Sequence, residues 1–340
     1  MATRTDEELI DLTEDGQPRR HPDGGDDRGR DAERPGDVPA SGWKDVALRV
    51  KGEVKEDQVS LLSAGVAFFL LLALFPALAA LVSLYGLFAD PDQVAQQVTD
   101  LTGALPEEAQ SLITDQLESI TGQSQGIGVT LAVSIAAALW AASSGVKHLI
   151  GAVNAAYDEK ESRGFLKLRG LSLGLTVGAI AFATIAIGVI AVLPALADEL
   201  PFGSIGQTLV QIGSYVGLAV GFALGLAVLY RYAPDRDAPR WQWVSWGAVI
   251  ATVVWILGSV AFSVYVSNFG SYGETYGSIG AVIVLMLWLV VTAFAIILGA
   301  EVNSELEAQT AKDSTVGRPQ PMGQRDAVKA DDLGEPVARD

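Results

Sequence analysis

The stretch SIGAVIVLMLWLVVTAFAIILGA, residues 278–300, is continuously apolar and contains no charged side chain. A helix needs about 20 apolar residues to cross the hydrocarbon core of a bilayer. Five runs of similar length and character precede it. We therefore expect six membrane-spanning helices, over residues 61–88, 127–146, 171–197, 207–230, 244–266 and 278–300.

The apolar runs favour helices over the strands of a membrane barrel. Half of the chain is hydrophobic (50%), and its charged residues crowd into the ends and a few connections. Barrel strands alternate polar and apolar residues over about ten positions, and these runs do not. The predicted fold class is an all-α membrane protein.

Lysine and arginine are distributed unevenly among the connections. Between Asp57 and Ala300 they occur only in two windows, 147–169 and 231–240, and four more lie at positions 44–55, just before the first run. The connections after the first, third and fifth runs contain acids and no base. Because cytoplasmic loops are enriched in basic residues, we expect both windows and both termini to be cytoplasmic.

The two ends of the chain differ in composition from its middle. Residues 1–41 and 309–340 are rich in charged residues, Gly and Pro and poor in apolar ones, so we expect two disordered cytoplasmic tails around a membrane domain at 42–308. The formal net charge of −17 and the lack of a basic stripe argue against a nucleic-acid partner. The absence of cysteine excludes disulfides and thiolate metal sites.

Two segments outside the spans have helical periodicity. Apolar residues recur from Trp43 to Val54 at spacings of three and four, which predicts a helix at the cytoplasmic interface or, in the simpler interpretation, a topology anchor. The connection 91–125 contains an apolar face from Leu112 to Ile120, so we expect an outer amphipathic helical segment between the first two spans.

Glycines repeat at four-residue intervals in the third and fourth spans. Such spacing lets helix backbones approach closely, so we expect both spans in the interior of the bundle; flexibility for transport is the alternative. The predicted packing glycines are Gly170, Gly174, Gly178, Gly213, Gly217, Gly221 and Gly225. The aromatic residues Trp241, Trp243 and Trp246 are typical of a belt at the membrane interface.

Four motifs resemble a known family. They are LSAGVAFFLLLALFPAL, LWAASSGVKHLIGAVNAAYDEKESRGFLKLR, LYRYAPDR and NFGSYGETYGSIGAVIVLMLWLVVTAFAIILGAEVNSELE. Together they resemble the YihY/BrkB family of bacterial inner-membrane proteins, historically mislabelled ribonuclease BN, over residues 42–308. The resemblance implies a multi-pass plasma-membrane protein with six helices, often described as a transporter, without a settled substrate. Ser144 departs from it, because many relatives carry a basic residue there.

Polar residues at the span ends are the candidate functional residues. Lys147, Arg231, Glu301 and Asn303 close the second, fourth and sixth spans at the same face. We hypothesise that Arg231 or Lys147 pairs with Glu301 in an inner gate or a site for a lipid headgroup. Snorkelling of the long side chains to the interface is the simpler alternative.

A second candidate site is the connection at 268–280, which mixes polar side chains with glycines. Glu274 and Tyr276 could coordinate a cation or a polar headgroup if this connection folds back into the bundle. A tight turn whose glycines satisfy the backbone geometry is an equal alternative.

No catalytic or metal-binding set is apparent in the sequence. The two histidines, His21 and His148, are far apart, and no nucleotide-binding GxxxxGK[ST] motif occurs. Ser143 and Lys147 have the spacing of an intramembrane Ser–Lys hydrolase, but Lys147 has a simpler role as a topology signal. We expect no enzyme activity and no cofactor.

The expected function is therefore transport or flipping of a small molecule, an ion or a lipid. A non-transporting membrane scaffold for envelope assembly is the alternative. We expect membrane lipids as partners. The chain could also form a homo-oligomer.

Overall fold

The computed structural model describes residues 28–85, 129–198, 203–268 and 278–336. These residues are helical except for connections and one isolated β-bridge between Pro239 and Thr315. The elements are η1 (Pro35–Asp37), α1 (Ala40–Glu56), α2 (Val59–Tyr85), α5 (Val129–Ala156), α6 (Phe165–Asp198), α7 (Gly203–Tyr232), α8 (Trp241–Asn268), α10 (Ser278–Glu307) and α11 (Val328–Asp331). The all-α fold is confirmed.

Four helices are long and apolar enough to cross a membrane. They are Phe165–Ile190 in α6, Gly206–Tyr232 in α7, Trp241–Ser267 in α8 and Val282–Glu307 in α10. A fifth candidate joins α1 to the first part of α2, with a bend of 62° between them. Over the described residues, α5 does not pass the same test. The structure thus supports a membrane protein with four or five candidate spans.

Each predicted span coincides with a long helix, and several helices extend beyond it at one end. The second predicted span stops at Val146, whereas α5 continues to Ala156. The sixth stops at Ala300, whereas α10 continues to Glu307. Polar residues can extend these helices because other segments pack around them, as described below.

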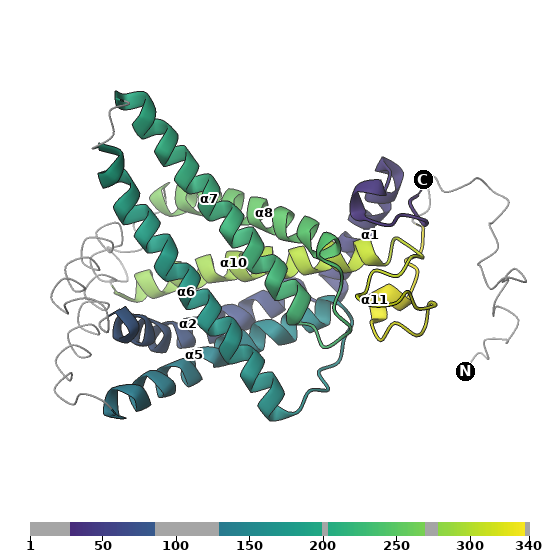
Figure 1. Ribbon diagram of the computed structural model, residues 1–340, viewed down its shortest axis with the longest axis horizontal. Coiled ribbons are helices and arrows are strands. Elements are labelled where there is room, and N and C mark those ends of the chain that lie inside the picture. Colours follow the sequence, from purple (N-terminus) through teal and green to yellow (C-terminus); the bar gives the residue numbers. More distant parts are fainter. Residues whose placement is uncertain (1–27, 86–128, 199–202, 269–277, 337–340) are drawn as a thin grey trace, which may run out of the picture.

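The centre of the bundle is formed by α2, α5, α8 and α10. Helix α10 contacts α1, α2, α5 and α8, whereas α6 and α7 contact each other and form one side of the molecule (Figure 1). Small and apolar side chains from α5, α7, α8 and α10 form the main core, including Ile150, Tyr230, Ala248 and Ile297. The third predicted span, α6, therefore lies at the side of the bundle, whereas the C-terminal part of α7, the fourth predicted span, contributes Leu226, Leu229 and Tyr230 to the core.

The predicted packing glycines correspondingly lie in open surroundings. A Cβ atom added at Gly170, Gly174, Gly178, Gly213, Gly217 or Gly225 would have no neighbour within 4 Å beyond its own helix, and at Gly221 it would meet Phe182. The prediction that all seven mediate close packing is wrong in this chain. The glycines do recur every four residues, but most of them face away from the neighbouring helices of the same chain.

Close approach occurs instead between α8 and α10. A Cβ atom at Gly247 would lie 2.1 Å from the carbonyl oxygen of Gly299, and one at Gly299 would lie 2.4 Å from the hydroxyl of Tyr230. These contacts leave room only for hydrogen, so both positions require glycine.

Helix α1 has the predicted apolar face, and that face packs on the protein. Val46 and Val50 are buried against Trp243, Val302 and Leu306, which belong to α8 and α10. The lysines at positions 51 and 55 are exposed. The helix is therefore docked on one end of the bundle through its apolar stripe.

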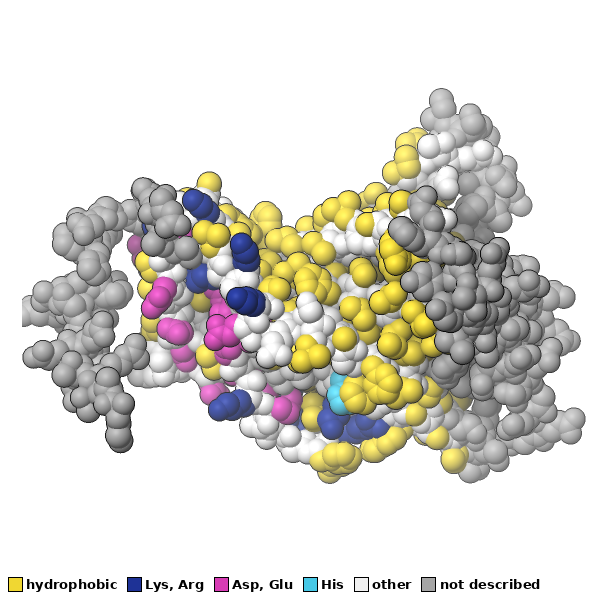
Figure 2. Space-filling view, turned by 180° about the vertical axis from the view of Figure 1, so that it is seen from behind, with side chains coloured by type: hydrophobic (Ala, Val, Ile, Leu, Met, Phe, Trp, Pro, Cys, Tyr) yellow, Lys and Arg dark blue, Asp and Glu magenta, His cyan; other side chains and the backbone are white. Residues whose placement is uncertain are grey.

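Most charged side chains of the described residues gather at this end of the molecule (Figure 2). We call it the charged end and define it as α1, the connections 157–164 and 233–240, and the segment 308–336. In Figure 1 it lies on the side of α1 and α11, opposite the outer ends of α6 and α7.

The segment 308–336 differs from the predicted disordered tail. Arg325 is buried and donates hydrogen bonds to the carbonyl oxygens of Ala311 (2.7 Å) and Ala330 (2.5 Å). The hydroxyl of Thr310 donates to the carbonyl of Ala32 at 2.7 Å, which ties this segment to the N-terminal part of the chain. Hydrogen bonds to backbone carbonyls, rather than apolar burial, hold the segment in place, so a composition rule based on hydrophobicity does not detect it.

Two predicted features lie outside the described residues. They are the outer amphipathic segment between the first two spans and the connection that contains Glu274 and Tyr276. The tail residues 1–27 and 337–340 also lie outside.

Candidate functional site at the charged end

Three glutamates on the last turns of α10 point into the charged end. Glu301, Glu305 and Glu307 are each at most 2% exposed. An ionised carboxylate is costly to bury unless a positive charge or hydrogen-bond donors compensate it. The partners of each glutamate therefore show which of the three has a structural role.

Glu305 is compensated by two cations. Arg49 on α1 contacts it at 2.5 Å, and Lys329 on α11 contacts it at 2.8 Å. Lys329 also contacts Glu53 at 3.1 Å and Asp158 at 2.9 Å. Burial by itself lowers the pKa of Lys329, but these carboxylates outweigh it, so its pKa is raised above the ordinary lysine value. The network connects α1, α10, α11 and the connection after α5.

Glu307 is compensated by Arg236 from the connection after α7. The two side chains are completely buried and lie 2.6 Å apart. The hydroxyl of Ser314 donates a second hydrogen bond to the same carboxylate at 2.6 Å. The guanidinium carbon of Arg236 also lies 5.1 Å from the centre of the Tyr157 ring. This buried ion pair joins the end of α10 to the connection after α7, and the hydrogen bond from Ser314 adds the segment after α10.

Glu301 has no such compensation. It is 0% exposed, and among the described residues no cation or hydrogen-bond donor contacts its carboxylate oxygens, although Asp57 is close enough to share a hydrogen bond with it when one of the two carboxyl groups is protonated. The acidic group that acts on it most strongly is Asp57, at the bend between α1 and α2. Burial, followed by the charge of Asp158, raises the pKa of Asp57. Two carboxyl groups thus face a poorly solvated region where α10 meets the start of α2.

The predicted partners of Glu301 lie elsewhere. Arg231 donates from Nη1 to the carbonyl of Pro239, and its guanidinium carbon lies 4.6 Å from the centre of a Trp241 ring. Lys147 is exposed and makes no ion pair with a described residue. The hypothesis that Arg231 or Lys147 pairs with Glu301 is therefore wrong for this structure.

Asn303 is a structural clamp between α8 and α10. Its side-chain oxygen accepts a hydrogen bond from the backbone nitrogen of Gly247 at 2.8 Å, and its side-chain nitrogen donates to the carbonyl of Val244 at 3.2 Å. Both of its polar atoms are used, so the geometry favours a packing role over substrate binding.

The polar residues of α5 also have local partners. The hydroxyl of Ser143 donates to the carbonyl of Trp140 at 2.8 Å, whereas Lys147 points to the exposed side. The Ser–Lys hydrolase geometry is therefore not formed. Among the described residues no group of three or more His, Cys, Asp or Glu side chains is arranged to hold a metal ion.

The tryptophans of α8 divide between two environments. Trp241 and Trp246 are about half exposed, as an interfacial belt requires, but Trp243 is completely buried between α1 and α10. Asp57, Arg49, Arg236 and Lys329 were not selected from the sequence. Nothing in the local pattern distinguishes Lys329 from the other charges of a polar tail, because its partners come from three distant segments.

Comparisons with known proteins identify relatives over most of the chain. The family model described as "Virulence factor BrkB" matches residues 50–323. Ribonuclease-like protein YfkH of Bacillus subtilis is 34% identical over 254 residues, which cover 72% of this chain and 88% of that protein. A UPF0761 membrane protein of Haemophilus influenzae is 20% identical over 257 residues, 74% of this chain and 91% of that protein. No solved structure matches the chain.

Proposed function

We propose that this chain, which belongs to the BrkB family of membrane proteins, moves a small molecule, an ion or a lipid across the bacterial plasma membrane. The observation that carries the proposal is the buried carboxyl group of Glu301, which faces Asp57 and has no ion-pair partner among the described residues. A membrane bundle that only filled space would gain stability from an apolar residue at such a position. Ionisable groups inside membrane helices that lack a packing role are typical of substrate or ion pathways.

The proposed topology has six spans with the charged end in the cytoplasm. The basic windows 147–169 and 231–240 both belong to this end, which agrees with the enrichment of lysine and arginine in cytoplasmic loops. The helices α2 and α5 complete the six spans in this arrangement. Both termini then lie on the cytoplasmic side.

In the proposed mechanism, Glu301 and Asp57 take up and release a proton or a small cation. Two carboxyl groups in one poorly solvated region do not ionise independently, because each negative charge raises the cost of the other. A cation or proton that neutralises one of them would be favoured when the site is closed, and would be released when water enters. The driving force would come from an ion gradient or from the substrate gradient.

A membrane scaffold is the second candidate function, and the ion pairs of the charged end favour it. The pair Arg236–Glu307 and the Lys329 network cross-link four segments, which suits a rigid platform for other envelope proteins. We propose neither an enzymatic step nor a nucleic-acid partner. Ribonuclease is a word in the name of one relative, and we do not propose that activity for this chain.

The two candidates differ in what they require of Glu301. The first step compares the lipids and exported metabolites of cells with and without the protein, to identify a substrate class. The second step compares Glu301→Gln with wild type in proteoliposomes that contain a pH-sensitive dye. The transport proposal predicts that Glu301→Gln folds normally but loses most substrate-dependent dye response. Glu33→Gln is the matched control, because Glu33 is an exposed glutamate outside the helices that carry Asp57 and Glu301.

Full transport by Glu301→Gln would contradict the proposed role of the carboxylate. No change in any lipid or metabolite on deletion, together with loss of an envelope complex, would favour the scaffold.

A further inference from the structure

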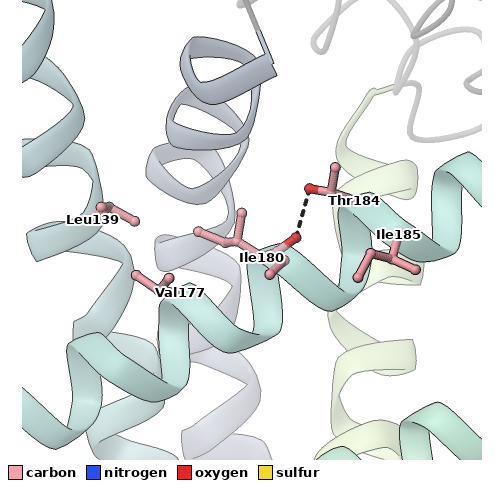
Figure 3. Close-up of a pocket in the computed structure, with 6 residues that line it drawn as sticks. Leu139, Val177, Ile180, Thr184 and Ile185 are labelled. Atoms are coloured by element: carbon pink, nitrogen blue, oxygen red, sulfur yellow. Dashed lines mark hydrogen bonds between the residues drawn. The ribbon is translucent and has the colours of Figure 1, made fainter. Parts of the chain in front are cut away.

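An apolar groove is lined by residues of α5 and α6 (Figure 3). Its cavity volume is about 290 Å³. It is lined by Leu139, Val177, Ile180, Ala181, Thr184 and Ile185. The one hydroxyl in this set, that of Thr184, donates to the carbonyl of Ile180 at 2.8 Å, so it is already satisfied. The groove therefore offers a hydrocarbon chain an apolar surface with no unsatisfied polar side chain in its lining.

A single arginine lies on the charged-end side of this groove. Arg169 on α6 is 9% exposed, and its guanidinium carbon lies 3.9 Å from the centre of a Trp140 ring. Trp140 directly follows the groove residue Leu139 in α5. One guanidinium nitrogen of Arg169 donates to the carbonyl of Trp140, but the buried Nε has no partner. No described carboxylate forms an ion pair with Arg169, so its charge is uncompensated within this part of the chain.

The distance along α6 between Arg169 and the groove matches the distance between the phosphate and the acyl chain of a lipid. Val177 lies eight residues after Arg169, which corresponds to about 12 Å along the helix axis. The hydrocarbon layer of one leaflet is about 15 Å thick, so a lipid with its phosphate beside Arg169 could place an acyl chain at the start of the groove. A positive charge at the polar end and an apolar slot below it match an anionic phospholipid.

We propose that Arg169 and the α5–α6 groove form a binding site for an anionic phospholipid of the leaflet at the charged end. The phosphate accepts hydrogen bonds from the guanidinium, and one acyl chain lies against Val177 and Ile180. The site does not depend on the proposed transport role of Glu301, since it is on a different face and uses different residues. A bound lipid would reinforce the contact between α6 and α5.

The test uses the proximity of Trp140 to the groove. The purified full chain is placed in nanodiscs in which phosphatidylcholine is replaced stepwise by brominated phosphatidylglycerol or by brominated phosphatidylcholine. Bromine quenches tryptophan fluorescence at short range, and the difference between wild type and Trp140→Phe isolates the signal of Trp140. We expect half-quenching at about fivefold lower content of the anionic lipid, which corresponds to about 1 kcal/mol for one basic residue.

Two variants separate the headgroup from the acyl chain. Arg169→Gln should remove the preference for phosphatidylglycerol while quenching by both lipids persists, and Arg169→Lys should keep most of the preference. Ala181→Phe, which fills the groove at an exposed position, should weaken quenching by both lipids. Arg34→Gln is the control, because Arg34 is an exposed arginine paired with Asp37 outside the groove.

Equal quenching of wild type by the two lipids would overturn the proposal. So would an unchanged preference in Arg169→Gln, which would leave Arg169 as an anchor for Trp140 only. If Arg169→Gln does not fold, Ala181→Phe still decides the matter, because undiminished quenching in that variant would exclude the groove as the acyl-chain site.

Discussion

The glutamates of α10 show how the same residue type acquires different roles over two turns of one helix. Glu305 and Glu307 each accept a cation at hydrogen-bond distance, from Lys329 and Arg236 respectively. Glu301 is equally buried and has none. Burial disfavours an uncompensated carboxylate strongly, so the first two glutamates are explained by packing and the third is not. This contrast is why we place the proposed function on Glu301.

The Arg236–Glu307 pair gives a prediction at this scale. Arg236→Leu leaves the carboxylate of Glu307 buried without its cation, and we expect the free energy of unfolding to fall by about 3–5 kcal/mol. The double variant Arg236→Leu, Glu307→Leu removes both charges and should recover most of that loss. Chemical denaturation in detergent micelles measures the free energy of unfolding of the single and the double variant. A double variant no more stable than the single one would show that the pair itself, rather than the uncompensated charge, decides stability.

At the scale of the helices, two glycines let the backbones of α8 and α10 approach closely where these helices cross. Gly247 and Gly299 place their backbones in contact, Asn303 bonds to the backbone of α8, and the hydroxyl of Tyr230 donates to the carbonyl of Ile296 at 2.7 Å. These interactions join α7, α8 and α10 without bulky side chains. By contrast, Gly213, Gly217 and Gly225 of α7 face open space, where lipid or a second copy of the chain could contact them, and only Gly221 of this repeat lies against another helix.

Two glycine substitutions test this difference. Gly299→Ala would bring a methyl group to 2.4 Å from the hydroxyl of Tyr230 and 2.7 Å from the carbonyl of Gly247, so we expect a loss of about 1–3 kcal/mol. Gly217→Ala has no neighbour within 4 Å and replaces a poor helix former, so stability should be unchanged or higher. Thermal unfolding followed by circular dichroism distinguishes them. Equal destabilisation by both would mean that the α7 repeat is also packed.

At the scale of the whole molecule, ion pairs and hydrogen bonds hold the segments of the charged end together, whereas the rest of the described bundle is mostly apolar. The charged end brings together four segments that are distant in sequence, namely 28–56, 157–164, 233–240 and 308–336. Arg163 illustrates this, because it contacts Glu161 at 2.5 Å and Asp235 at 3.5 Å across two connections. The stability of this end should therefore depend on pH in a way that the apolar bundle does not.

Acidification should act in two opposite stages. Burial raises the pKa of Glu53 and of Glu159, so the folded state binds these protons more readily, and stability should rise as the pH falls from 7 toward the ordinary glutamate value of 4.5. The hydrogen bond from Arg163 lowers the pKa of Glu161, so its stabilisation is present above pH 4.5 and is lost as the pH falls through the lower folded-state value. The temperature of unfolding in detergent, measured from pH 7 to pH 3, should pass through a maximum near pH 4.5. A temperature of unfolding that falls steadily from pH 7 downward would contradict this assignment. The variant Glu161→Gln should lose less stability than wild type below pH 4.5.

The sequence alone determined the features that depend on hydropathy along the chain. The long helices, their approximate bounds, the apolar stripe of α1 and the segregation of charge to a few connections all follow from local composition, because a bilayer selects for apolar length and for backbone hydrogen bonds within one segment. The family resemblance, likewise carried by contiguous motifs, was confirmed.

Only the tertiary structure decided which polar groups meet. Lys329, in a segment whose composition predicts disorder, reaches Glu305 and Asp158, while Arg231 turns to Pro239 and leaves Glu301 alone. Gly247 and Gly299, which pack closely, are not part of a four-residue repeat, whereas three of the four glycines of the α7 repeat have no neighbour within 4 Å. Ion pairs and close contacts depend on the relative positions of helices in space, and in a membrane these are chosen by the fit of whole surfaces rather than by the period of any one segment.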